Sequence, residues 1–140
     1  MRYLTRQFAI GALRRGHGIE QFLGGTQVGG EAAIQWVAIS PMDRQYRVSL
    51  HTVQDPDDDE FGDLPNLMPL DPVDEDYIGE GRELGASQGE TEAMVLAEQL
   101  TTAQPNLWVN HAVAGDEYMD FVRSRRNTTD THGRQDQSRS

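Results

Sequence analysis

The chain of 140 residues contains no cysteine and no lysine. The absence of cysteine excludes disulfide bonds, thiol catalysis and thiolate metal sites. No apolar run approaches the roughly 20 residues of a membrane-spanning helix, and the first 25 residues do not follow the pattern of a signal peptide. We therefore expect a protein outside the membrane, located in the cytoplasm. A domain of this length buries roughly two thirds of its unfolded surface and folds without covalent staples.

Acidic residues are the most prominent feature that is present. The chain has 23 acidic residues against 12 arginines, and its formal charge is −11. By segment, the charge is +3 over residues 1–54, −17 over residues 55–122 and +3 over residues 123–140. An acidic surface repels phosphate groups and attracts basic proteins. High net charge also serves solubility alone, so an acidic, salt-adapted domain without a binding role remains an alternative.

The first third of the chain predicts helix followed by a strand pair. Residues 1–25 form a predicted helical segment, with one helix over Thr5–Arg15 and one or two further helical turns over Ile19–Leu23. Two apolar stretches, Ala33–Ile39 and Gln45–Val53, alternate with the period of a strand. The five residues between them contain a proline and an aspartate, which favour a turn. The pattern therefore predicts a β-hairpin.

Residues 55–86 are predicted to form a long acidic loop. Pro65, Pro69 and Pro72 exclude the interior of a helix and the centre of a sheet. Apolar residues lie between the prolines, which favours anchoring of the loop to the core at several points. The segment Gly81–Ser87 is predicted to add a short edge strand.

The last third predicts two helices and a tail. Ser87 and Glu90 have the spacing of a capping box. The apolar residues that follow recur at helical spacing: Ala93, Leu96, Ala97 and Leu100. A last helix is predicted over Asp116–Arg125, with an inner face of Tyr118, Phe121 and Val122. Residues 127–140 contain no apolar side chain and are predicted to be disordered. The fold class is α+β: a single domain over residues 1–126, with a small antiparallel sheet packed against two or three helices.

No motif in the sequence fixes a chemistry. A calcium loop beginning at Asp55 would need glycine at its sixth position and glutamate at its twelfth, but Glu60 and Asn66 stand there. The four histidines have no metal-ligand spacing. Trp36 and Trp108 are expected in the core. The sequence therefore predicts no catalytic residue, no metal and no cofactor, and a small hydrolase that uses loop carboxylates is the least favoured alternative.

Two short motifs near the C-terminal end carry a resemblance. They read Trp108-Val109-Asn110 and Glu117-Tyr118-Met119-Asp120-Phe121. They resemble the W-V-N and E-Y-x-D-[FY] ending of a small group of acidic, uncharacterised bacterial proteins, and the resemblance covers about residues 36–122. In size and acidity the chain is also similar to immunity proteins of polymorphic toxins. The resemblance implies a binding protein and assigns no site residue.

The leading hypothesis is a non-enzymatic acidic module that binds a basic protein, such as an immunity-like inhibitor of a toxin. The alternative of a DNA-mimic inhibitor requires carboxylates spaced like phosphates, which the prolines disfavour. The predicted partner-binding residues are the acidic residues of the loop: Asp55, Asp57, Asp58, Asp59, Glu60, Asp63, Asp71, Asp74, Glu75 and Asp76.

Overall fold

The computed structural model describes residues 2–71 and 81–139, and side chains as far as residue 127. The helices are α1 (Arg6–Arg14), α2 (Glu90–Leu100) and α3 (Ala114–Arg139), with a short 3-10 helix η1 (Leu64–Asn66). The strands are β1 (Ile19–Val28), β2 (Glu31–Met42), β3 (Gln45–Gln54), β4 (Arg82–Ser87) and β5 (Val109–Asn110). Within these residues the strands form one antiparallel sheet in the order β4-β3-β2-β1-β5. The predicted α+β class is confirmed.

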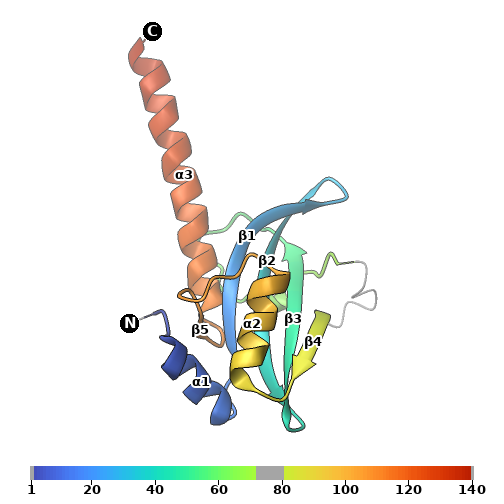
Figure 1. The fold of residues 1–140 in the computed structure, drawn as a ribbon. Coiled ribbons are helices and arrows are strands. Elements are labelled where there is room, and N and C mark those ends of the chain that lie inside the picture. Colours follow the sequence, from blue (N-terminus) through green and yellow to red (C-terminus); the bar gives the residue numbers. More distant parts are fainter. Residues whose placement is uncertain (1, 72–80, 140) are drawn as a thin grey trace.

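The sheet is covered on both faces (Figure 1). Successive residues of a strand point to opposite faces, and central β2 is apolar on each. Val37 and Ile39 join α1 and α2 in one buried cluster, which also contains Trp108. Ile34 and Trp36 join α3 in a second buried cluster. The expectation that both tryptophans belong to the core is confirmed.

The predicted hairpin is confirmed, but the element before it differs. β2 and β3 pair in antiparallel register, with Trp36 opposite His51. The helical turns predicted over Ile19–Leu23 are wrong, because this stretch is the first half of β1 and pairs with β2. A five-residue stretch carries too weak a local preference to resist the pairing with a buried neighbour. Gly29 and Gly30, both with positive φ, form the two-residue turn between β1 and β2.

The predicted edge strand Gly81–Ser87 corresponds to β4, at one edge of the sheet. Residues 72–80 lie outside the described residues, so the loop predicted over residues 55–86 is described over residues 55–71 and 81–86, and Arg82 onward forms β4 instead of loop. The part over residues 55–71 is tied to the sheet, since Pro69 bridges to Val53 and the amide of Gln54 donates to the carbonyl oxygen of Met68 (2.9 Å).

The helix α2 forms where its apolar spacing predicts, but its start and inner face differ. Gly89 is the N-cap, and its amide donates to Ser87 Oγ (3.4 Å), so the predicted capping box is absent. Ala93, Met94 and Ala97 are buried, whereas Leu100 is 53 % exposed. Leu100, the last residue of α2, therefore lies off the predicted inner face, and the buried face of the helix includes Met94.

The predicted inner face of α3 is confirmed. Tyr118 and Val122 are fully buried, and Phe121 packs against the same cluster. The helix starts at Ala114 and continues to Arg139, past the end predicted at Arg125 and over residues predicted to be disordered. No proline interrupts the helical hydrogen bonding there.

None of the helices in the described part of the chain is long and apolar enough to span a membrane.

The two sides of α2 give a test of this packing. Met94→Asp places a charge in the core and should cost more than about 3 kcal/mol of unfolding free energy. Leu100→Asp, on the exposed side of the same helix, should change it by less than about 0.5 kcal/mol. Urea unfolding followed by circular dichroism measures both. Equal stability of the two variants would contradict the packing of α2 on the sheet.

Candidate functional site

Asp55 anchors residues 55–63, which we call the acidic segment, to α3. Its carboxylate accepts hydrogen bonds from the Tyr118 hydroxyl (2.7 Å), the Asp57 amide (2.8 Å) and Arg125 (3.1 Å). Its side chain is 4 % exposed. Burial by itself raises the pKa of Asp55, but these hydrogen bonds outweigh it, so the pKa is lowered. Burial and the bond to Asp55 raise the pKa of Tyr118. Asp55 thus fixes the start of the segment.

Arginines of α3 neutralise two further acidic residues. Arg125 binds Asp57 (2.6 Å), and its guanidinium lies 5.0 Å from the centre of the Phe121 ring. Arg126 binds Asp59 (3.1 Å), and Arg123 donates to the carbonyl oxygen of Asp59 (3.0 Å). The sequence places these arginines in a separate basic segment. The structure brings them onto the acidic one.

Asp71 is also engaged within the chain. Its side chain is 7 % exposed and forms an ion pair with Arg82 (2.8 Å), the first residue of β4. Arg82 is the one base within residues 55–92. Asp71 therefore ties the end of the described loop to the edge strand and offers little surface to a partner.

Three predicted residues, Asp58, Glu60 and Asp63, remain exposed; we call them the exposed carboxylates. Within residues 2–71 and 81–127 none of them lies within ion-pair distance of an arginine or histidine. Asp58 accepts from the Glu60 amide (2.9 Å), and Asp63 accepts from the Asn66 side-chain amide. The remaining predicted residues, Asp74, Glu75 and Asp76, lie outside the described residues.

A cavity of about 150 Å³ lies where residues 61–65 cross the start of α3. It is lined by Glu20, Trp36, Gly62, Asp63, Leu64, Pro65, His111, Ala112 and Gly115. Gly62 and Gly115 approach so closely that a side chain on Gly115 would overlap the carbonyl oxygen of Gly62. Two glycines therefore allow the acidic segment to close this cavity against α3. We call it the Glu20 cavity.

Glu20 is the buried carboxylate of this cavity, and it is 5 % exposed. Its Oε1 accepts from the amide of Ala114 (3.1 Å), the first residue of α3, and thereby satisfies a free donor at the start of the helix. Its Oε2 lies 3.9 Å from Nδ1 of His111. Burial raises the pKa of Glu20, although the backbone of Ala114, His111 and the backbone of Ala112 act in the opposite direction.

The lining of the Glu20 cavity includes a strained residue. Ala112 has φ of 75°, in the left-handed region that non-glycine residues rarely adopt. Such strain persists only where the surrounding structure imposes it, and it recurs at binding sites. The sequence does not predict this cavity, because Glu20 lies in a stretch predicted to be a helical turn. An acidic residue within Ile19–Leu23, taken as a strand, was the available signal.

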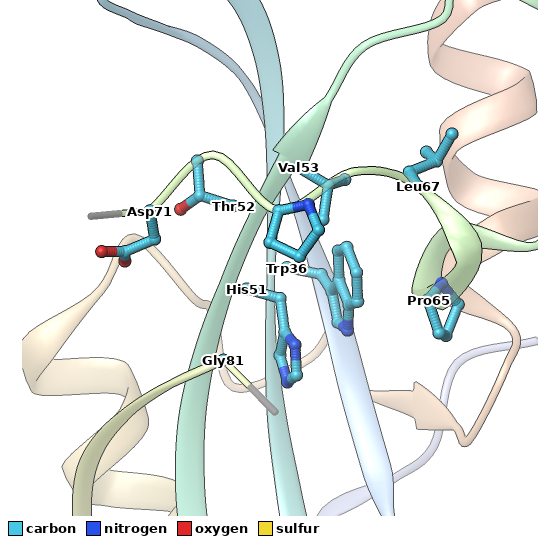
Figure 2. Close-up of a pocket in the computed structure, with 9 residues that line it drawn as sticks. Trp36, His51, Thr52, Val53, Pro65, Leu67, Asp71 and Gly81 are labelled. Carbon is cyan, nitrogen blue, oxygen red and sulfur yellow. The ribbon is translucent and has the colours of Figure 1, made fainter. Parts of the chain in front are cut away.

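A second hollow lies beside Trp36 and His51, whose rings stack with centres 4.6 Å apart (Figure 2). Ser49 Oγ lies 3.0 Å from Nε2 of His51, which is the spacing of a nucleophile and its base. Ser49 is 1 % exposed, however, and the hollow of about 10 Å³ holds about one water molecule. Figure 2 shows the Asp71 carboxylate directed away from His51. The pair packs the sheet and offers no room for a substrate.

The described part of the chain contains no group of three or more histidine, aspartate or glutamate side chains placed to hold a metal ion. The structure therefore provides no reason to assign a metal to either hollow.

No family model matches the chain, and neither a curated protein nor a solved structure matches it. The resemblance in the W-V-N and E-Y-x-D-[FY] motifs therefore stays a prediction. In the structure Val109–Asn110 form β5, and Tyr118 is the buried partner of Asp55. These positions serve packing of the fold.

The anchor at Asp55 can be tested at Tyr118. Tyr118→Phe removes the hydroxyl that donates to Asp55 inside the protein, and should cost about 1–3 kcal/mol of unfolding free energy. Tyr3→Phe is the control, because Tyr3 is 39 % exposed and its hydroxyl bonds Glu117 at the surface. The control should change stability by less than about 0.5 kcal/mol. Two equal losses in urea unfolding would argue against a buried anchor.

The raised pKa of Glu20 gives a test with a defined sign. When the folded-state pKa of a carboxyl exceeds its ordinary value of 4.5, the stability that the group contributes is lost as pH rises from 4.5 through the folded-state pKa. Glu20→Gln keeps an oxygen for the Ala114 amide and cannot ionise. The unfolding free energy of the variant, relative to the unmodified protein, should therefore increase between pH 4.5 and neutral pH. A difference that stays flat or decreases would contradict the burial of an ionisable Glu20.

Proposed function

We propose that the protein is a non-enzymatic binding module for a basic protein partner. The main support is the negative charge that remains on residues 55–63 after some of their carboxylates have formed ion pairs with arginines of α3. Residues 55–63 contain six acidic side chains, and Asp55, Asp57 and Asp59 bind arginines of α3. The exposed carboxylates are left over, and they lie on one short segment next to the start of α3. This surplus of negative charge is the surface that we assign to the partner.

Charge complementarity gives this surface a physical role. A charged patch that meets its opposite raises association rates by about 10 to 10³-fold, and salt weakens the effect. The internal ion pairs support this role, because they hold the segment in one conformation and leave the exposed carboxylates to face solvent. A segment held in place loses less entropy when a partner binds.

An immunity-like inhibitor of a basic toxin, acting in the cytoplasm, is the form of this function that the size and acidity favour. The DNA-mimic alternative requires a regular row of carboxylates. The exposed carboxylates instead lie on an irregular segment that leads into the 3-10 helix η1. The geometry therefore supports a basic protein of the toxin kind as the partner better than it supports a DNA-binding protein.

The test compares two charge-matched double variants. Asp58→Asn with Glu60→Gln removes two exposed carboxylates at the proposed surface. Asp43→Asn with Glu92→Gln removes two exposed carboxylates elsewhere. Asp43 lies in the turn between β2 and β3, at the opposite end of β3 from this surface, and Glu92 lies on α2, which covers the other face of the sheet from α3. Basic proteins captured from a cell extract are purified, and their association rates with each variant are measured by surface plasmon resonance. The first variant should associate several-fold more slowly at about 0.05 M salt, and the deficit should shrink at about 0.5 M.

Equal rates for both double variants would show that the acidic segment only solvates the surface. The proposal also fails if no purified basic protein associates with the unmodified chain at low salt. Folding of each variant is checked by its circular dichroism spectrum and melting temperature.

A further inference from the structure

We propose that the Glu20 cavity binds the guanidinium group of an arginine side chain. The inference rests on the proposed function for the source of this arginine, a basic protein partner. The chemistry of the cavity itself is independent of the partner and is tested without it.

The charge of the lining selects a cation. Glu20 and Asp63 contribute carboxylates, and no arginine belongs to the lining. Glu20 is withdrawn from water, and the imidazole Nδ1 of His111 lies 3.9 Å from Glu20 Oε2, beyond hydrogen-bond distance. A buried carboxylate gains most from a partner that brings a positive charge and hydrogen-bond donors. An anionic ligand would meet the same carboxylates and be repelled.

The size and walls of the cavity favour one side chain. Cavities for drug-sized ligands measure about 300–1,000 Å³, and the Glu20 cavity measures about 150 Å³. Trp36 supplies an aromatic wall. A guanidinium is planar, weakly hydrated, stacks on aromatic rings and offers paired donors to a carboxylate. An ammonium group is more strongly hydrated and lacks the planar shape, so arginine fits this wall and carboxylate better than lysine.

The cavity is held in shape before any ligand arrives. The Ala114 amide fixes one oxygen of Glu20. The contact of Gly62 with Gly115 sets the distance between the acidic segment and α3. Ala112 keeps its left-handed conformation in the wall. A site organised in this way binds with a smaller entropic penalty than one that must form around the ligand.

The cavity and the exposed carboxylates have separate roles. Asp63 belongs to both, since it is exposed and lines the cavity. Surface charges act mainly on association rates, whereas a buried charged contact acts mainly on dissociation rates. Arginine is among the residues that most often dominate an interface. The exposed carboxylates therefore attract the basic partner, and the Glu20 cavity retains one of its arginines.

The test is an NMR titration of the 15N-labelled chain with Nα-acetyl-L-arginine amide. The citrulline analogue is the neutral isostere, and the lysine analogue tests the shape of the cation. Saturable shifts are expected at the Trp36 indole N–H and at the amides of Ala112 and Ala114. The Trp108 indole lies in the other core cluster and should not shift. Citrulline should bind at least about tenfold more weakly than arginine.

Variants of the chain complete the test. Glu20→Gln should weaken arginine binding at least about tenfold, and Asp63→Asn about two- to threefold. Asp116→Asn is the matched control, because Asp116 is exposed near the cavity without lining it, and it should change binding less than about twofold. Should Glu20→Gln fail to fold, Asp63→Asn against Asp116→Asn gives the same comparison.

Three outcomes overturn the inference: citrulline binds as well as arginine, shifts occur away from the cavity, or folded Glu20→Gln binds arginine unchanged. Equal binding of the lysine analogue overturns the assignment to a guanidinium. If arginine fails to bind while a basic partner still associates in a salt-dependent way, this inference falls and the proposed function stands. If arginine binds but the double variant at Asp58 and Glu60 associates normally, the proposed function falls and the cavity stands.

Discussion

The structure depends on one strand that is buried on both faces. β2 carries Val37 and Ile39 on one side and Ile34 and Trp36 on the other, and all four are nearly inaccessible to water. Such a strand must have a neighbour on each edge and a layer over each face. β1 and β3 fill the edges, α1 and α2 cover one face, and α3 covers the other. The position of α3 then decides where the acidic segment lies.

The packing of α3, as well as the sequence, decides which acidic side chains of the protein stay unpaired at its surface. α3 leaves the sheet at the end where β3 passes into the acidic segment, so its arginines meet the first acidic residues of that segment. The pairs that involve Asp57 and Asp59 are partly exposed to water, and each contributes little stability, about 0–1 kcal/mol. Their main consequence is selection: they neutralise some carboxylates and leave others to solvent. The contact that carries more energy is the buried one between Tyr118 and Asp55.

The two sites lie close together because they share one segment. Residues 58–63 bear the exposed carboxylates on their solvent side, and Gly62 and Asp63 line the Glu20 cavity. The cavity takes its other walls from β1, β2 and the start of α3. A partner attracted by the segment thus encounters a shaped, acidic hollow beside it. Ser49 and His51 offer no comparable site for nucleophilic catalysis, because Ser49 is buried and the His51 ring is stacked on Trp36 beside a hollow that holds about one water molecule.

The sequence by itself determined the α+β class, the β2–β3 hairpin, the inner face of α3 and the burial of both tryptophans, because periodic apolar residues record which side of an element faces the core. It also determined the acidic segment as composition. Only the tertiary structure decided that Ile19–Leu23 is a strand, because pairing with β2 outweighs a weak local preference. It likewise decided which carboxylates are free, since ion pairs between residues about 70 positions apart, such as Arg125 with Asp55, leave no local pattern. Only the tertiary structure decided the Glu20 cavity as well, because its walls meet only when α3 packs on the sheet.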